Sequence, residues 1–401
     1  MSLQNPRLGT SPVRITLIVL AGLMAAFAVL VPAQSEAKAK KKKDPKVTVM
    51  TRNLFLGADL SPAIGAATLG EAIDGAGEIY NELESTDFPE RAPLLGEEIN
   101  ESKADLVGLQ EVALWRTQTP SDLGWTESGG AGEPATDVKY DFLAELMKHI
   151  GDDYKVVGTQ NEFDAELPVD QDGSDATGGA FGAELDARLT MRDVILVRKG
   201  SKVKVDKKSL DMDHFENLYT ANVGGVQITA QRGWLSVDAK VKGDKKTKGG
   251  KFHFVNTHLE AFGDPSIREA QAREMFDKGG PLQTKQQLIF LGDINSGGPK
   301  DKVGTGFTED GDEGAYNAFT KDFGLTNLGA RQTCCYPSLF ADDLDGYELD
   351  HTVDHVFVKP KLKQLDAYVT GDDPTVTTES GLLSSDHGGL VSTIKLSKPK
   401  K

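Results

Sequence analysis

The sequence has very few cysteines and histidines, and too little positive charge to balance its acids. Only two cysteines and seven histidines occur in 401 residues. Zinc sites use clustered cysteines and histidines, and no His-x-x-x-His pair falls on an expected helix, which argues against zinc. Lysine and arginine number 45 against 61 acidic residues, which gives a formal charge of −16. Such an acidic chain should not bind polyanions non-specifically, which counts against a simple nucleic-acid-binding module.

One long apolar run, residues 15–31, follows Arg7 and Arg14 near the N-terminus. It ends in a small-residue site that a signal peptidase accepts, so we expect residues 1–33 to be a signal peptide and the protein to be secreted. Residues 34–45 are then expected to form a basic flexible linker. The alternative is a retained membrane anchor, because the run is only slightly short for a spanning helix.

The two cysteines are neighbours, Cys334 and Cys335. Export would permit a disulfide between them. Neighbouring Cα atoms lie about 3.8 Å apart across a trans peptide, however, which is shorter than the usual range in disulfides. A vicinal disulfide, two buried thiols and an intermolecular bridge therefore all stay open.

Short apolar runs rich in Val, Ile, Leu and Phe recur along the chain and predict buried strands. They lie at residues 47–52, 105–109, 193–198, 233–241, 252–257, 288–291, 353–358 and 390–395. Amphipathic helices are predicted at residues 90–102, 137–150 and 266–276, and acidic, glycine-rich loops at residues 119–136, 164–186 and 300–314. The order lacks a strict βαβ rhythm. It predicts one α/β domain, residues 46–397, with two packed mixed sheets and helices on both outer faces.

Polar side chains follow or open most of these expected strands. They are mainly carboxylates, carboxamides and imidazoles: Asn53, Gln110, Glu111, Arg192, Asp193, Asn256, His258, Asp293, Asn295, Asp354, Asp386 and His387. One such residue can simply be solvated, but six such sites in one chain predict a shared function. Carboxylates and carboxamides are the ligands that Mg²⁺ or Ca²⁺ prefers. The sequence therefore predicts a divalent metal, with Mg²⁺ favoured and Mn²⁺ or Ca²⁺ able to substitute.

The order and rough spacing of these motifs are similar to those of a known superfamily. The motifs are Asn53, Gln110-Glu111, Asn256-Thr257-His258-Leu259, Gly292-Asp293-Ile294-Asn295, Asp354 and Ser385-Asp386-His387. In this order the chain resembles the endonuclease/exonuclease/phosphatase superfamily of metal-dependent phosphoesterases, from about Val47 to Lys395. The resemblance implies a four-layer α/β sandwich with the active site at one end.

The resemblance also implies a metal site and a group that activates water. Glu111 resembles the principal metal ligand, helped by Asn53. Asp386 resembles a further carboxylate beside the metal. Asp293 resembles the group that orients or deprotonates the attacking water, with Asn295 next to it.

The remaining roles concern the phosphate group. His258 resembles a donor to the phosphoryl oxygens, and Asp354 with His387 resembles a carboxylate–imidazole pair. The sequence leaves open whether His387 acts as a base or stabilises charge. Arg192 and Arg232 are candidates for binding the substrate phosphate, because a guanidinium binds such groups well.

The substrate is less well defined than the chemistry. We expect an exported phosphodiesterase, and the alternatives are a secreted endonuclease on DNA, a sphingomyelinase-like phospholipid hydrolase and an inositol-phosphate phosphatase. Trp115, Trp125 and residues 336–340 are candidates for contact with a lipid surface. A catalytically silent binding module of the same fold is the non-enzyme alternative. The sequence indicates no obligate protein partner.

Overall fold

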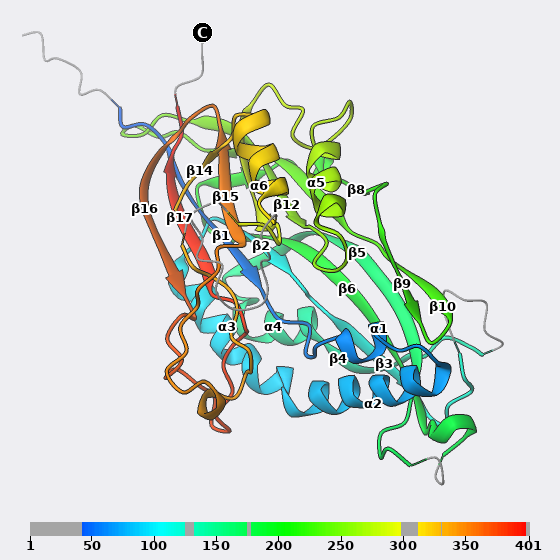
Figure 1. Cartoon of the computed structure of the whole chain (residues 1–401). Helices are drawn as coiled ribbons and strands as arrows, with labels where there is room; N and C mark the ends of the chain where they lie inside the picture. The colour runs from blue at the N-terminus through cyan, green and yellow to red at the C-terminus, as the bar shows by residue number, and fades with distance from the viewer. Residues whose placement is uncertain (1–41, 125–131, 175–177, 298–311, 330, 398–401) are drawn as a thin grey trace, which may run out of the picture. The chain divides into compact units, whose positions relative to one another are not determined.

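Two large β-sheets lie face to face in the computed structural model of the chain (Figure 1). The structure describes residues 42–124, 132–174, 178–297, 312–329 and 331–397. The expected signal peptide, most of the expected linker, Trp125 and most of the expected loop at 300–314 lie outside these residues. No helix within the described ranges is both long enough and apolar enough to cross a membrane.

The first sheet has eight strands in the order β16-β17-β1-β2-β6-β3-β4, with β5 paired to β6. Their bounds are β1 Lys46–Asn53, β2 Leu106–Gln110, β3 Leu114–Gln118, β4 Asp137–Asp141, β5 Tyr154–Val169, β6 Leu185–Arg198, β16 Lys363–Thr370 and β17 Gly389–Lys395. Strands β1 and β2 are parallel, and the other pairs are antiparallel.

The second sheet has seven strands in the order β14-β15-β13-β12-β11-β7, with β8 paired to β11. Their bounds are β7 Val203–Val205, β8 Asp211–His214, β11 Gly233–Val241, β12 Gly250–His258, β13 Gln287–Asp293, β14 Thr326–Asn327 and β15 Asp354–Lys359. Strands β12 and β13 are parallel. A separate hairpin consists of β9 Tyr219–Val223 and β10 Val226–Ala230.

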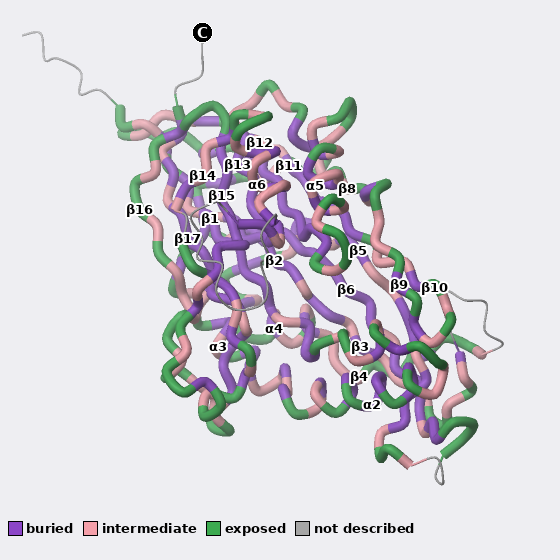
Figure 2. Tube along the Cα trace, in the orientation of Figure 1, coloured by how far each residue is buried: buried purple, intermediate pink, exposed green. Residues whose placement is uncertain are grey.

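Three apolar clusters hold these layers together, and the buried strands are visible in Figure 2. Between the sheets, Val49 and Ile195 of the first pack with Val237 and Ile289 of the second. Helices α2 Leu69–Ser85, α3 Phe88–Ser102 and α4 Phe142–Ile150 share a cluster with the first sheet, and α5 Pro265–Glu274 shares one with the second. Short helices are α1 Ser61–Ile64 and α6 Gly314–Asn317, and single turns lie at residues 180–182, 207–209, 318–322 and 341–343. The predicted sandwich of two mixed sheets with outer helices is confirmed.

Two predicted elements are wrong in part. The expected loop at residues 164–186 instead contains the end of β5 and the start of β6. Its acids are not simply solvated, since Asp164 forms an ion pair with Arg188 across the two strands at 2.6 Å. The helix expected from residue 137 begins only at Phe142, because residues 137–141 pair with β3 as strand β4. Asp141 then caps α4 by accepting a hydrogen bond from the backbone of Leu143.

Candidate active site

The predicted site residues meet because of how the strands are paired. In the parallel pair β1–β2, Asn53 is in register with Gln110, the residue before Glu111. In the parallel pair β12–β13, His258 is in register with Asp293, and the antiparallel β15 places Asp354 beside Asp293. Parallel strands end at the same edge of a sheet, so each sheet presents its polar residues at one edge.

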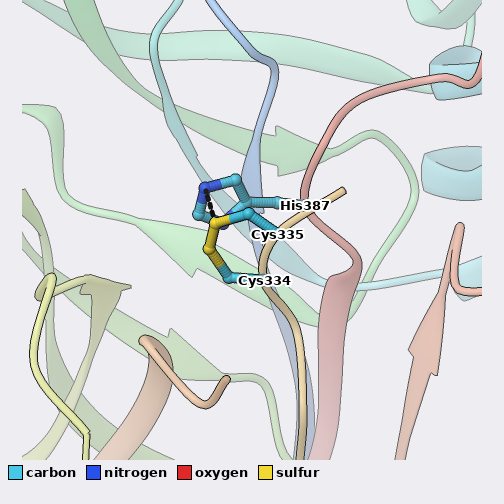
Figure 3. Close-up of side chains that lie close together, drawn as sticks. All are labelled: Cys334, Cys335 and His387. Atoms are coloured by element: carbon cyan, nitrogen blue, oxygen red, sulfur yellow. Dashed lines mark hydrogen bonds between the residues drawn. A yellow bond between two sulfur atoms is a disulfide. The ribbon is translucent and has the colours of Figure 1, made fainter. Parts of the chain in front are cut away.

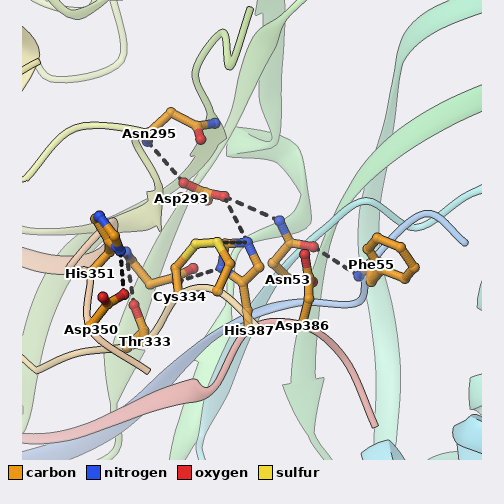
Figure 4. The surroundings of a disulfide bond; sticks show 12 residues. Asn53, Phe55, Asp293, Asn295, Thr333, Cys334, Asp350, His351, Asp386 and His387 are labelled. Carbon is orange, nitrogen blue, oxygen red and sulfur yellow. Dashed lines mark hydrogen bonds and ion pairs between the residues drawn. A yellow bond between two sulfur atoms is a disulfide. The ribbon is translucent and has the colours of Figure 1, made fainter. Parts of the chain in front are cut away.

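Asn53 joins the two edges. Its side-chain nitrogen donates to Glu111 Oε1 at 3.0 Å. The same nitrogen donates to Asp293 Oδ2 at 3.1 Å (Figure 4), which links the first sheet to the second. Its oxygen accepts from the backbone of Phe55 at 2.9 Å. Glu111 is held from its other side, since Oε2 accepts from the backbone of Leu56 at 2.7 Å. These bonds fix the side chains of both residues in the site.

Asp293 is fully buried and stands between the two predicted histidines. Its Oδ1 accepts from the backbone of Asn295 at 2.9 Å. Its Oδ2 lies 3.6 Å from His258 Nε2 and 3.8 Å from His387 Nε2. Burial, and then the charge of Asp354, raise the pKa of Asp293 to about 7. A carboxyl group with a pKa near neutrality is suited to proton transfer at physiological pH.

His258 is a neutral hydrogen-bond donor in this arrangement. Arg232 Nη1 lies 3.0 Å from His258 Nδ1, and because a guanidinium can only donate, Nδ1 must accept. The ring proton of the neutral imidazole is therefore on Nε2, which faces the carboxylates of Asp293 and Glu111. The side-chain nitrogen of Asn295 also lies 3.1 Å from this Nε2, and with the proton there it donates to the carbonyl of Leu259 and not to the ring. Burial, followed by the charges of Arg232 and His387, lowers the pKa of His258 well below its ordinary value.

In contrast to His258, His387 favours its protonated form. Its Nδ1 lies 2.9 Å from Asp354 Oδ2. Burial opposes the charged ring, but the carboxylates of Asp354, Asp386 and Asp293 outweigh it and raise the pKa of His387 well above its ordinary value. The imidazolium form is therefore favoured at neutral pH, next to the position expected for a phosphate.

The predicted metal ligands form a cluster that is rich in carboxylates. Burial and the neighbouring carboxylate of Glu111, against the opposing charge of His387, raise the pKa of Asp386 to about 6. The same Glu111 raises the pKa of Asp293. Buried carboxylates that disfavour one another's ionisation are stabilised by a cation. Glu111, Asp386 and Asn53 therefore fit a hard divalent ion, which binds carboxylate and carboxamide oxygens.

A different set of side chains at the site has its ligand atoms close enough together to hold a metal. Ligand atoms of Asp293, Asp354 and His387 lie within 4.8 Å of one another. The His387 nitrogen that faces Asp354 already shares a hydrogen bond with it. This set is better explained as a carboxylate–imidazole pair beside a proton acceptor than as a metal site.

Cys334 and Cys335 are joined by a disulfide that lies against the site (Figure 3). Cys335 Sγ is 3.7 Å from His387 Nε2. The backbone on either side of the pair is bonded to the His387 segment, from Gly388 N to Thr333 O and from Tyr336 N to Asp386 O. Of the three states that the sequence left open, the structure has the vicinal disulfide, and its position next to His387 could not be foreseen.

The two predicted phosphate-binding arginines are placed differently. Arg232 reaches the site through His258 and is buried. Arg192 does not reach it: its guanidinium forms an ion pair with Asp141 at 2.6 Å and donates to the carbonyls of Val112 and Ala113. These bonds hold it at the start of α4, so the geometry gives no support to a phosphate-binding role for Arg192.

Three buried acids lie behind the site, and none of them was assigned a role from the sequence. Glu162, Asp193 and Glu260 surround Arg232, and the Arg232 Nε atom lies 3.6 Å from Glu260 Oε2. Asp193 was recognisable from its position beside Arg192, since side chains alternate along a strand and only one of two neighbours can face the site. Glu162 and Glu260 gave no such signal.

Comparisons with known proteins can now be set beside this geometry. No protein-family model and no curated protein matches the chain. Among solved structures, an endonuclease/exonuclease/phosphatase family protein from Bacteroides thetaiotaomicron is similar at 16% identity and a TM-score of 0.47, covering 89% of this chain and 100% of its own. A mannosyl-6-phosphatase from the same species is similar at 16% identity and a TM-score of 0.46, covering 87% and 100%. The catalytic domain of human nocturnin is similar at 17% and 0.43, covering 89% and 97%.

The chain resembles the endonuclease/exonuclease/phosphatase superfamily. The predicted resemblance is confirmed at the level of the fold, which this chain's own two mixed sheets and outer helices display. Identities and TM-scores this low carry no conclusion about activity or substrate.

Proposed function

We propose that this protein is a divalent-metal-dependent phosphodiesterase that cleaves its substrate by in-line attack of water. One observation carries the proposal: Asn53 bonds Glu111 and Asp293 together, and so places a carboxylate cluster next to a candidate base. Solvated strand ends would have no reason to converge from two sheets onto one point.

Glu111 and Asp386, with Asn53, would hold the metal. A bound divalent ion would neutralise charge on the phosphate and polarise a phosphoryl oxygen. Mg²⁺ is the ion we propose, because the donor set consists of oxygens.

The remaining steps are assigned to the chain's own side chains. Asp293 orients the attacking water and accepts its proton, since its pKa is about 7 and its position is fixed by two hydrogen bonds. His258 donates from Nε2 to a phosphoryl oxygen without carrying charge. His387, protonated beside Asp354, stabilises the negative charge that develops as the ester bond breaks.

The test is hydrolysis of the soluble diester bis(para-nitrophenyl) phosphate by the purified chain, with Mg²⁺ and with EDTA. We expect turnover that needs the metal and is lost in His387→Ala. His149→Ala is the matched control, because His149 lies at the end of α4, away from the site. Duplex DNA, sphingomyelin vesicles and an inositol polyphosphate are tested in parallel. Failure to cleave any of these esters would overturn the proposal and favour the silent binding module.

We also propose that the protein is exported, and this rests on the sequence of residues 1–33 alone. The basic start and the apolar run of that segment are typical of a secretory signal. Expression of the full chain with an N-terminal sequence determination of the product would test it. Cleavage after the apolar run supports export, whereas an intact N-terminus in a membrane fraction supports the anchor.

A further inference from the structure

An apolar cavity of about 690 Å³ opens onto the candidate active site. Glu111, Asp293 and His387 line one end of it. Away from them the lining is formed by apolar side chains, among which are Leu167, Leu189 and Ile228. Pockets for small molecules commonly measure roughly 300–1,000 Å³, so this one is large enough for a substantial ligand group.

Strands β5 and β6 extend past the second sheet, and the apolar side chains on that part of the two strands line the cavity. Ile195 and Val197 of β6 pack in the cluster between the sheets. Leu189 and Met191 lie on the same face of β6, since side chains alternate, but they line the cavity instead. There the face is covered by α1, α2 and the β9–β10 hairpin (Figure 1).

Small side chains keep this space open. Alanines line it from every wall: Ala63 and Ala76 from the helices, Ala165 and Ala187 from the two long strands, and Ala221 from the hairpin. Protein interiors normally pack without voids larger than a water molecule. An apolar cleft of this size that ends at the candidate catalytic side chains is the kind of site that binds a ligand.

The charges around the cavity do not fit a polyanion. Two acids, Asp59 and Glu82, are among the residues that line it. Its two arginines are already engaged: Arg232 with His258 and Glu260, and Arg268 with Asp312 at 3.2 Å. A groove for a nucleic-acid backbone needs free cationic side chains along its length. A neutral hydrocarbon chain needs none.

We propose that this cavity binds the hydrocarbon chain of the substrate, and that the substrate is a phospholipid whose phosphodiester lies at Asp293 and His387. The inference rests on the proposed function, of which it names the substrate class. Tyr219 and Phe262, whose rings stack at 6.4 Å between centroids, also line the cavity and provide an aromatic wall close to the site. The apolar chain would enter between this wall and the strands, and the phosphate would stay among the polar residues.

The test uses binding as well as turnover. Butyl, octyl and dodecyl phosphate, as monomers, are titrated into the full chain with Mg²⁺ by calorimetry. Each added methylene should lower the dissociation constant by about threefold to fourfold until the cavity is filled. The heat capacity change of binding should become more negative with chain length, because apolar surface is buried. Equal affinity for all three esters would overturn the proposal.

Filling the cavity gives the matched test. Ala187→Phe places a ring in the cavity from β6, remote from the catalytic residues, and Ala221→Leu fills it from the hairpin in case the first variant does not fold. Either should remove the gain between butyl and dodecyl phosphate and leave butyl phosphate binding unchanged. Ala144→Phe, on the exposed face of α4, is the control and should bind all three like the unmodified chain. A cavity-filled variant that keeps the full gain would contradict the proposal.

Turnover experiments distinguish failure of the lipid-substrate inference from failure of the proposed phosphodiesterase activity. Cleavage of bis(para-nitrophenyl) phosphate without any dependence on chain length would leave the phosphodiesterase standing and overturn the lipid substrate. With both supported, monomeric short-chain phosphatidylcholines should be cleaved with a KM that falls as the acyl chains lengthen. In Ala187→Phe the fall in KM with acyl-chain length should disappear, whereas the control Ala144→Phe should keep it.

Discussion

The Nδ1 atom of His387 lies 2.9 Å from Oδ2 of Asp354, and both side chains are buried at the edge where the two sheets meet. The negative charge of the Asp354 carboxylate stabilises the protonated imidazole of His387, which burial alone would destabilise. The pair therefore sets the pH range over which a cationic group faces the substrate phosphate.

Asp354→Asn should move the alkaline limb of the pH profile of kcat/KM to lower pH. The reason is that removing the carboxylate charge lowers the pKa of His387, so the imidazolium is lost earlier as pH rises. Asp238→Asn is the control, since Asp238 forms a similar pair with His253 at 2.8 Å on β11 and β12. A shift of the acid limb instead would show that His387 acts as a base, and an unchanged profile would mean that it does not titrate in catalysis.

Asp293→Asn should lower kcat by about 10²–10⁴-fold, the usual contribution of a positioned general base. The amide is nearly isosteric and can still accept the hydrogen bond from the backbone of Asn295, so the fold should be retained. Circular dichroism and the thermal midpoint check the fold, and steady-state kinetics on a soluble diester check the rate. Asp277→Asn, on an exposed turn after α5, should leave kcat unchanged. Full activity in Asp293→Asn would assign proton transfer to another group.

Glu111→Gln should raise the Mg²⁺ concentration required for half-maximal activity by at least about tenfold, because one charged oxygen ligand is replaced by a neutral one. The side chain should stay in place, since the carboxamide oxygen can accept from the backbone of Leu56 as Glu111 does. Metal titration of the rate measures the effect. Glu97→Gln, exposed on α3, provides the comparison. If both variants showed the same metal dependence, Asp386 would have to be the principal ligand.

The parts of the fold that could be predicted are those with an unbroken apolar pattern. Strand β13 has a continuous run of Leu, Ile and Phe, and in β1 and β12 apolar residues recur at least at every second position along most of the strand. Their polar ends could then be placed at one edge, because parallel strands end together. Strand β5 was not predictable, since acids interrupt its pattern: Asp164 pairs with Arg188 of β6, and Glu162 is buried.

Prediction from the sequence was limited in the same way for individual residues of the site. Strand-end motifs identified Asp293 and His387, whose positions follow from the ends of β13 and of the loop before β17. They could not decide between Arg192 and Asp193, since that choice depends on which face of β6 turns inward. The cavity could not be predicted from the sequence either. Its walls come from elements far apart in the chain, and no single alanine among them indicates a cavity.

Glu162→Gln should make the protein more stable at neutral and alkaline pH. Both carboxyl oxygens of Glu162 are buried without a hydrogen-bond partner, and His214 Nε2 lies 3.7 Å from Oε2. Burial, and then the charge of Asp193, raise the pKa of Glu162 well above its ordinary 4.5. The folded state therefore holds a proton that the unfolded state releases as pH rises above that value.

The sign of the pH dependence follows from this difference. The contribution of Glu162 to stability is complete below the unfolded pKa and is lost as pH rises towards the raised folded pKa, at up to about 1.4 kcal/mol per pH unit. Glutamine cannot ionise, so urea unfolding of Glu162→Gln should match the unmodified chain near pH 4.5 and exceed it increasingly at higher pH. Asp193, whose pKa burial also raises, remains in the variant, so part of the pH dependence should persist. Glu101→Gln, exposed on α3, should follow the unmodified chain throughout. A difference between Glu162→Gln and the unmodified chain that stayed constant with pH would mean that Glu162 is already ionised in the folded protein.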